Sequence, residues 1–370
     1  MQKHSFYLTK FLVELGVDVT LYHCVTQGEI PTESQVIEDL SLPSDGQFKS
    51  ECIPFPKGNG LPGHYIRSNY LYSIQQGKKI QKESFDLIYA KGFAAWHLID
   101  QKKKKAKLPP IAVNFHGYEM FQPAADFKTK LQRYLLRGPV KFNNRHADYV
   151  FSYGGKITTI IESLGVPTNR IIDIPTGIAS SWLKSKDQIL PQPKVKLMFL
   201  GRYERRKGIE ELNEVLEELM DQVDFEVDFV GPIPASKRLK HSKITYHGEI
   251  KDQQKLQEIM DKCSVLLCPS HSEGMPNVIM EGMARGLAVL ATDVGAVSIQ
   301  VDQNVGWLIE PAKKEDLIKS LQEIDCCSSE DLLSKRHAAH DKIASRFTWE
   351  QISKQTLEEM QTVIKLNPEA

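Results

Sequence analysis

Short apolar runs, rich in β-branched side chains, alternate along the chain with longer segments whose apolar positions recur every three to four residues. This alternation is typical of repeated β-α-β units and predicts an α/β protein built on parallel sheets. The predicted strands of the first half are 17–24, 86–92, 111–117 and 147–155. Those of the second half are 194–201, 225–231, 244–248, 264–270, 287–293 and 306–311.

A polar segment with two prolines, residues 183–194, separates the two sets of strands and is interpreted as a linker. We therefore place a first domain at 1–183 and a second at 184–346. The last segment, 347–370, has helical periodicity over most of its length and no strand follows it. We expect this helix to pack on a domain that the preceding residues have already formed.

The amino end departs from the expected order of elements. A doubly wound domain normally begins with a strand, a glycine-rich turn and then a helix. Here residues 3–16 already have the pattern of that helix, and the first predicted strand comes after it. The expectation is that the first strand and its loop are missing, through truncation or because this protein lacks a phosphate- or acceptor-binding turn there.

Composition narrows the classes of ligand. At roughly 100 to 200 residues per domain, 370 residues suit two domains. The 47 Lys and Arg residues are balanced by 47 Asp and Glu residues, so the bulk positive charge of a general nucleic-acid binder is missing. No nucleic-acid partner is therefore expected, and a charged ligand must be held by local charges.

The chain shows no targeting or metal-binding signature. No apolar run approaches the roughly 18 residues of a transmembrane helix, and the first residues lack the apolar core of a secretory signal, so a cytoplasmic location is predicted. The six cysteines form neither a CxxC pair nor a disulfide framework. Cys263 and Cys268 are interpreted as buried core residues rather than ligands, and no metal site is predicted.

The densest chemical signal is the segment 269–284, PSHSEGMPNVIMEGMA. A strand ends at Cys268 and a helix is predicted to begin with Pro276 at its first position, where the missing N–H does no harm. The start of a helix at a strand's carboxyl edge can bind an anion or ligand hydroxyls. The candidate backbone N–H groups are those around Met275, Asn277 and Val278. Gly274 would let the backbone approach the ligand closely.

Two carboxylates in this segment lie eight positions apart. Glu273 precedes the helix and can face a bound sugar, while Glu281 lies in its second turn and can reach a ribose. The simpler interpretations are a helix-start acid stabilised by the helix dipole and an ordinary exposed helical Glu. The surrounding strand, glycine and proline favour the ligand-binding interpretation.

A second candidate anion site is the loop GRYERRKG at 201–208, between a predicted strand and a helix over 209–220. From this position Arg202 and Lys207 could converge on a diphosphate. The alternative is a solvated basic loop, and that is the interpretation we prefer for Arg205 and Arg206.

A third candidate is His116, which stands before a glycine at the carboxyl end of the strand 111–117. Such an edge faces the crevice in which doubly wound folds bind ligands. A purely structural histidine is the alternative. Residues 175–178, PTGI, either return the chain to this crevice or form only a turn.

These motifs resemble a known family. In order and spacing, GRYERRKG, PSHSEGMPNVIMEGMARG, TDVGA and GWLIEP resemble the donor domain of retaining family 4 glycosyltransferases, whose GT-B fold has two Rossmann-like domains. The resemblance is strongest over 195–325. It extends more weakly through HGYE, ADYVFSYGG, IIDIPTGI and FTWEQ, so nearly the whole chain is covered.

The resemblance implies transfer of a sugar from a nucleoside diphosphate sugar, most often a UDP-sugar, to an acceptor hydroxyl with retention, without cofactor or metal. It assigns the diphosphate to Arg202 and Lys207, the sugar to Glu273 and the ribose to Glu281. It places the base near Glu249 and Ile250, with His116 beside the transferred sugar. It also implies that the last helix crosses back to the first domain.

Two other functions stay open on the sequence alone. One is a nucleotide-sugar epimerase or hydrolase, which would use the donor pocket without an acceptor. The other is a non-catalytic relative that binds a nucleotide or a partner protein. The expected acceptor is a carbohydrate or a lipid-linked saccharide.

A basic amphipathic segment, 127–145, predicts peripheral contact with the inner face of a membrane, which would suit a lipid-linked acceptor. Gly138 and Pro139 interrupt its pattern. The alternative, a pair of helices on the domain surface, is the slightly stronger prediction.

Overall fold

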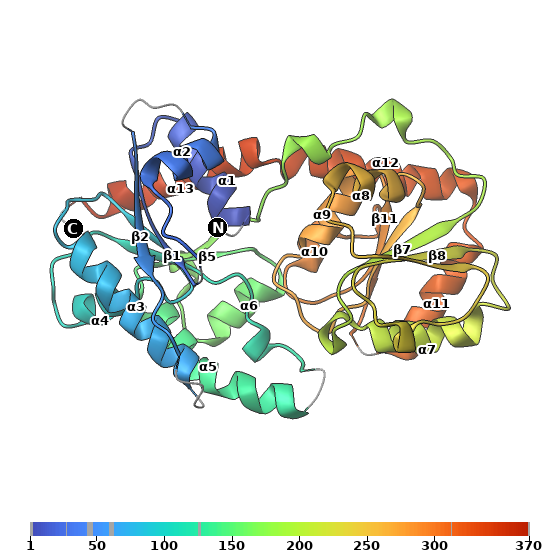
Figure 1. Cartoon of the computed structure of the whole chain (residues 1–370), viewed down its shortest axis with the longest axis horizontal. Coiled ribbons are helices and arrows are strands. Elements are labelled where there is room, and N and C mark those ends of the chain that lie inside the picture. The colour runs from blue at the N-terminus through green and yellow to red at the C-terminus, as the bar shows by residue number, and fades with distance from the viewer. Residues whose placement is uncertain are drawn as a thin grey trace.

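The computed structural model of the chain describes residues 3–26, 28–42, 47–58, 63–124, 127–311 and 313–368, with the side chains of 127–130 and 132 outside that description. Two α/β units lie side by side (Figure 1), each with helices packed around parallel strands. Every strand pair of the described residues is parallel. The predicted fold class, α/β with parallel sheets, is confirmed.

Among its described residues, the first domain contains two sheets. Its elements are α1 (Lys3–Glu14), β1 (Val19–Val25), α2 (Glu33–Leu40), β2 (Phe48–Pro54), α3 (His64–Ile80), β3 (Ile88–Lys91), α4 (Trp96–Lys103), β4 (Ile111–Asn114), α5 (Phe127–His146), β5 (Tyr149–Ser152), α6 (Lys156–Ser163) and β6 (Ile171–Asp173). β1 pairs with β2, and the second sheet has the order β3-β4-β5-β6. All four residues of β4 are buried, as expected for a strand covered on both faces.

This division differs from the single sheet that a doubly wound domain predicts. In such a domain the first strand lies in the middle of the sheet, between the strands that are here β1 and β3. The described residues begin within α1, and among them β1 and β3 do not pair. The strands therefore form two separate groups, joined by the apolar side chains of α1 and its neighbours.

The second domain has one six-stranded sheet among the described residues, in the order β12-β11-β10-β7-β8-β9. Its elements are β7 (Lys196–Leu200), α7 (Ile209–Leu219), β8 (Glu226–Val230), β9 (Ile244–Gly248), α8 (Gln253–Met260), β10 (Val265–Cys268), α9 (Asn277–Ala284), β11 (Ala288–Thr292), α10 (Val297–Gln300), β12 (Gly306–Ile309), α11 (Lys314–Asp325) and α12 (Ser329–Arg346). The strand order is that of a doubly wound nucleotide-binding domain. Cys263 and Cys268 are buried, as predicted.

The segment between the domains is held in place by α12. Arg336 of this helix is 2% exposed, and it donates hydrogen bonds of 2.7 Å to the carbonyls of Gly286 and Leu190. His340 lies 2.8 Å from the carbonyl oxygen of Lys184. The segment interpreted as a polar linker is therefore a docked connection whose backbone carbonyls are satisfied by buried side chains.

The final helix, α13 (Trp349–Leu366), lies against the first domain beside α1 (Figure 1). Its buried Trp349 stacks on Tyr7 with ring centroids 5.5 Å apart. At its start, the N–H of Ile178 donates to Phe347 O at 2.8 Å, and the N–H of Trp349 donates to Ile178 O at 3.1 Å. Residues 175–178 thus meet the point where the chain returns to the first domain.

The segment 127–145 forms one helix, α5, and the predicted break at Pro139 is absent from it. Buried residues that follow the proline hold this helix in place. Val140 and Asn144 are fully buried, and Asn144 accepts a 2.7 Å hydrogen bond from Tyr118. Packing therefore outweighs the local disfavour of proline. None of the helices in the described residues is both long and apolar enough to cross a membrane.

Candidate functional site

The Glu273 carboxylate is the centre of the candidate site. Its Oε1 accepts hydrogen bonds from Lys207 Nζ at 2.7 Å and Ser270 Oγ at 2.8 Å, and its Oε2 lies 3.1 Å from Arg206 Nη1. β7 and β10 are neighbours in the sheet, so the loops after their carboxyl ends meet at one edge. This adjacency brings the two cations to Glu273.

A glycine makes this meeting of loops sterically feasible. Gly208 has φ +69°, and a Cβ added there would lie 1.8 Å from the carbonyl oxygen of Pro269. Only glycine combines that backbone conformation with so close an approach. Gly208 is thus needed for the close approach of the two loops, and Lys207 supplies the charge beside Glu273.

Charge pairing keeps Glu273 ionised although it is only 6% exposed. Burial by itself would raise the pKa of this carboxyl group, but the charges of Lys207 and Arg206 outweigh burial and hold the pKa below its ordinary value. The site therefore combines an ionised hydrogen-bond acceptor with two cations in contact with it.

The 270–275 loop of the second domain packs against the first domain. A Cβ on Gly274 would lie 1.9 Å from the carbonyl oxygen of His116, and a Cβ on Gly295 would lie 2.2 Å from the carbonyl oxygen of Glu273. Gln122 of the first domain donates to Glu273 O at 2.6 Å and accepts from its N–H at 3.2 Å. The first domain thus contacts the backbone that carries the central carboxylate.

Helix α9 starts one residue later than predicted. Pro276 has extended backbone angles and is the N-cap, so the first helical residue is Asn277. The first N–H groups of the helix, including those of Asn277 and Val278, have no intrahelical acceptor and point toward the edge of the sheet. Met275 is buried, and its sulfur accepts a 3.3 Å contact from the N–H of Thr176 in the first domain.

The basic residues of the 201–208 loop occupy different positions from those expected. Arg202, predicted to join Lys207, has a side chain 71% exposed and pairs with Glu204 at 2.9 Å. Arg206, predicted to be solvated, is half-buried and also donates to Ser272 O at 2.9 Å. Arg205 pairs with Glu210 and Glu211 at the start of α7. The structure brings together Arg206, Lys207 and Glu273, and leaves Arg202 outside.

Glu281 is buried on the second turn of α9 and faces the first domain. Its Oε1 lies 3.1 Å from Lys3 Nζ, at the start of α1. Lys3 therefore already pairs with this carboxylate, and a ribose would have to displace Lys3 or share the carboxylate with it. Across the same boundary Lys156 pairs with Asp293 at 2.9 Å.

His116 follows the carboxyl end of β4, opposite the 270–275 loop. Its Nδ1 lies 2.8 Å from the Tyr153 hydroxyl, and the ring remains accessible to solvent. Partial desolvation, helped by the nearby Lys91 amine, lowers the pKa of His116 to about 3. The imidazole is thus neutral at pH 7 and can donate or accept a hydrogen bond.

Glu249 and Ile250 follow the carboxyl end of β9, at the same edge of the second sheet. Glu249 is exposed and Ile250 is half-buried. In the described part of the chain, no group of three or more His, Cys, Asp or Glu side chains could hold a metal ion.

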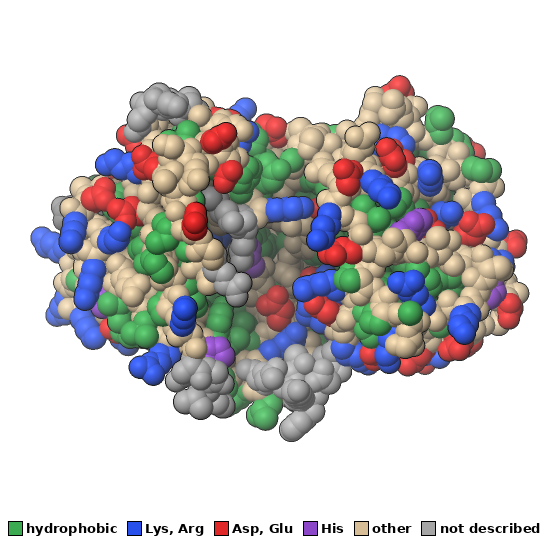
Figure 2. Space-filling view, in the orientation of Figure 1, with side chains coloured by type: hydrophobic (Ala, Val, Ile, Leu, Met, Phe, Trp, Pro, Cys, Tyr) green, Lys and Arg blue, Asp and Glu red, His purple; other side chains and the backbone are tan. Residues whose placement is uncertain are grey.

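The hollow between the two domains, here called the cleft, is visible in Figure 2, with acidic, basic and histidine side chains along it. Sequence reasoning identified the residues that follow strands β4, β7 and β10. It missed Gln122 and Lys91, which contribute to the same boundary. Lys91 is the last residue of β3, and its position at the end of the predicted strand 86–92 was the signal in the sequence.

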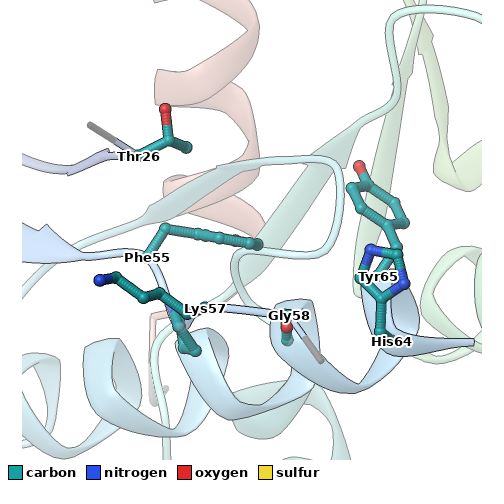
Figure 3. Close-up of a pocket in the computed structure, with 8 residues that line it drawn as sticks. Thr26, Phe55, Lys57, Gly58, His64 and Tyr65 are labelled. Carbon is teal, nitrogen blue, oxygen red and sulfur yellow. The ribbon is translucent and has the colours of Figure 1, made fainter. Parts of the chain in front are cut away.

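A separate hollow of about 200 Å³ lies at the carboxyl ends of β1 and β2. Figure 3 shows Phe55 and Lys57 on one side of it and His64 and Tyr65 on the other, with Thr26 above them. Its lining comes from the strand ends and from the first turn of α3. This hollow offers aromatic faces and hydrogen-bonding groups on the first domain.

Comparison with known sequences agrees with this geometry. A sequence model of the family described as Glycosyltransferase Family 4 matches residues 1–182. A model of the family described as Glycosyl transferases group 1 matches residues 194–324, which include Arg206, Lys207, Glu273 and Glu281. The two matches divide at the boundary between the two domains.

Two curated relatives show how far the similarity extends. The putative teichuronic acid biosynthesis glycosyltransferase TuaC of Bacillus subtilis strain 168 is 31% identical over 157 residues, 40% of each chain. The putative colanic acid biosynthesis glycosyltransferase WcaL of Salmonella typhimurium strain LT2 is 24% identical over 270 residues, 68% of this chain and 64% of that protein. The alignments therefore span less than two thirds of either relative.

Solved structures show the same architecture. Sucrose-phosphate synthase from Thermosynechococcus elongatus superposes with a TM-score of 0.75 at 17% identity, covering 97% of this chain and 92% of that one. Anabaena HepE in complex with UDP and glucose gives 0.63 at 15% identity, covering 93% and 99%. Both likenesses support the predicted fold of two Rossmann-like domains. The chain belongs to the glycosyltransferases that these family models describe, and its fold is GT-B.

Proposed function

We propose that this protein transfers a glycosyl group from a nucleoside diphosphate sugar, with UDP as the preferred nucleotide, to an acceptor hydroxyl with retention of configuration. The observation that supports this most is the contact of Lys207 and Arg206 with Glu273 at the start of α9. Cations and helix N–H groups suit a diphosphate, and an adjacent carboxylate suits sugar hydroxyls. The retention and the UDP preference come from the family resemblance.

The reaction exchanges one bond at the anomeric carbon for another. The bond to the diphosphate oxygen breaks, a bond to the acceptor oxygen forms, and the acceptor proton leaves with the released diphosphate or to solvent. Negative charge grows on the leaving diphosphate. Lys207, Arg206 and the N-terminus of α9 are already fixed at one edge of the sheet and would stabilise that charge as it develops.

Donor binding would exchange partners within the cluster. Both cations contact the Glu273 carboxylate. A diphosphate would take over Lys207 and Arg206, and the sugar hydroxyls would take over the carboxylate oxygens. Every buried charge would keep a partner throughout, which avoids the large penalty for an unpaired buried charge.

The acceptor would enter from the first domain. His116 is accessible in the cleft and neutral, so it can hydrogen-bond a sugar hydroxyl beside the reacting carbon. TuaC and WcaL are named for polysaccharide biosynthesis, and a Campylobacter jejuni relative, 25% identical over 209 residues, is named for a diphospho-undecaprenol substrate. We therefore infer a saccharide acceptor, with a lipid-linked one included in the proposal.

A screen of UDP-, GDP- and ADP-sugars by thermal shift tests the donor. We expect a UDP-sugar to raise the melting temperature, because a ligand at 100 times its Kd adds about 2.7 kcal/mol of stability. Product analysis of the stabilising sugar, with and without saccharide acceptors, then separates transfer from hydrolysis. Stabilisation by none of the three nucleotides would contradict the proposal, and free sugar as the sole product would indicate a hydrolase.

Peripheral membrane contact through α5 is a further part of the proposal. Leu131, Tyr134 and Leu135 share one side of the helix and are 64%, 65% and 53% exposed, and Lys141 and Arg145 are exposed farther along it. An apolar stripe that continues into basic residues suits an anionic lipid surface.

Co-sedimentation with phosphatidylglycerol vesicles at low salt tests this surface. We expect the wild-type chain to bind and the double variant Leu131→Glu, Leu135→Glu to bind about tenfold or more weakly, since burying a leucine contributes about 1.5–3 kcal/mol. Leu190→Glu, at a 60% exposed leucine between the domains, is the matched control and should bind like the wild type. Absence of wild-type binding would remove the membrane contact from the proposal.

A further inference from the structure

A cluster of polar side chains on the first domain lies beside His116 and has no assigned role. Lys91 ends β3 and pairs across the sheet with Asn114, the last residue of β4. Tyr153 follows β5, and its hydroxyl contacts His116. His4 of α1 completes the cluster, with its ring centroid 5.8 Å from that of His116. Three neighbouring strand ends and one helix thus converge at the carboxyl edge of the sheet.

The Lys91 amine is held there without a counter-charge. Its Nζ donates to Asn114 Oδ1 at 2.5 Å and lies 5.5 and 5.8 Å from the ring centroids of Tyr89 and Tyr153. Among the described residues no carboxylate forms an ion pair with it. Burial lowers the pKa of Lys91 well below its ordinary value. A desolvated lysine is normally paired, so this amine has unused capacity for an anion.

An unpartnered atom on His4 provides independent support. The Nδ1 of His4 is buried and has no hydrogen-bond partner among the described residues. The ring packs edge-on against His116 and Trp349, and Lys91 is close enough to help lower the pKa of His4. Buried imidazole nitrogens usually have a hydrogen-bond partner, so this atom is available to a ligand.

We propose that Lys91 binds a phosphate-type oxyanion of the acceptor, next to His116. This inference rests on the proposed glycosyl transfer and specifies the acceptor's chemical class. A phosphate offers several oxygens, which can accept from the amine and from a neighbouring imidazole together, and its negative charge would favour the protonated amine that burial disfavours, whereas a sugar hydroxyl carries no such charge. The site is distinct from that of Lys207 and Arg206, which lie in the second domain and contact Glu273 of the same domain.

The test is calorimetric titration of pyrophosphate into the full chain saturated with UDP, which keeps the donor cations occupied. We expect the wild type to bind pyrophosphate and Lys91→Met to bind it about tenfold or more weakly, the usual effect of losing a hydrogen bond to a charged group. Lys91→Arg should retain most of the affinity. Lys49→Met, at an exposed lysine of the same domain, is the matched control and should behave like the wild type.

The outcomes separate this site from the donor site. If UDP does not bind, the donor proposal fails, and pyrophosphate titration of the Lys207→Met variant still tests Lys91. Unchanged pyrophosphate affinity in Lys91→Met overturns the inference. If Lys91→Met does not fold, two other results overturn the inference. One is that UDP-saturated wild type does not bind pyrophosphate, and the other is that a folded Lys91→Arg protein has lost this binding.

A parallel titration identifies the source of the phosphate. Glycerol phosphate represents a soluble acceptor, and vesicles that contain phosphatidic acid represent a lipid-linked one. Lys91→Met should weaken whichever of the two binds to the wild type. The vesicle titration is done in the Leu131→Glu, Leu135→Glu background, so that contact through α5 does not contribute. If the ligand that binds does so with equal affinity in the presence and absence of the Lys91→Met change, Lys91 does not hold its phosphate and the inference is overturned.

Discussion

Replacement of Lys207 with methionine is expected to lower kcat for sugar transfer about 100- to 1000-fold, the usual effect of removing one fixed donor from a site of developing charge. Affinity for UDP should fall about tenfold or more. Steady-state kinetics and calorimetric titration of UDP measure the two effects. Lys319→Met, at a 78% exposed lysine of α11, is the matched control and should leave both unchanged.

Two further variants show whether Lys207 acts through the diphosphate. Arg202→Met should have a smaller effect on UDP affinity, because Arg202 lies at the surface with Glu204. Glu273→Gln should leave UDP affinity unchanged or tighter, since it removes the carboxylate that competes for Lys207, while transfer falls because a sugar ligand is lost. Unchanged UDP affinity in Lys207→Met would contradict the assignment of the diphosphate site.

The Lys207→Met variant is also expected to change the free energy of unfolding, by an amount that depends on pH. Because the pKa of Glu273 is lowered in the folded protein, its ionised form stabilises the fold above the unfolded pKa, and this contribution is lost as the pH falls through the lowered folded value. Lys207→Met leaves Glu273 with Arg206 and Ser270. We expect a loss of about 1.5–3 kcal/mol at pH 7 that narrows toward acid pH, measured by urea unfolding.

The parts of the fold that the sequence predicted are those governed by local pattern. A parallel strand covered on both faces must be a continuous apolar run, so β4, β10 and β11 could be recognised without tertiary information. Their carboxyl ends then indicated where His116 and Glu273 would lie. The contact of Lys207 with Glu273 also follows, once β7 and β10 are placed side by side in the sheet.

Tertiary contacts decided the rest. Arg202 and Arg206 belong to the same short loop, and which of them reaches Glu273 depends on how the loop turns before Gly208. Pro139 has the local signature of a helix break, yet burial of Val140 and Asn144 keeps α5 continuous. Residues that act across the domain boundary, such as Gln122, carry no local motif, because their partners belong to another part of the chain.

The second large effect is expected from Gly274→Ala, which should lower kcat/KM about 100-fold while UDP affinity stays within a few-fold of wild type. The added Cβ would lie 1.9 Å from the carbonyl oxygen of His116 and 2.9 Å from its carbonyl carbon. These are backbone atoms of the other domain and cannot rotate away. Relief requires the domains to separate, and a displacement of about 1 Å between reacting groups is enough for a 100-fold loss.

The separation itself is measurable. Small-angle X-ray scattering of Gly274→Ala should give a larger radius of gyration than the wild type, since the change acts between domains and leaves each core intact. Gly138→Ala, where an added Cβ meets nothing within 4 Å, is the control for the substitution and should retain wild-type activity and size. Wild-type activity in Gly274→Ala would show that transfer does not require His116 and the 270–275 loop to be in contact. A loss of UDP binding equal to the loss of activity would instead place the damage within the second domain, in the geometry of Glu273 and Lys207.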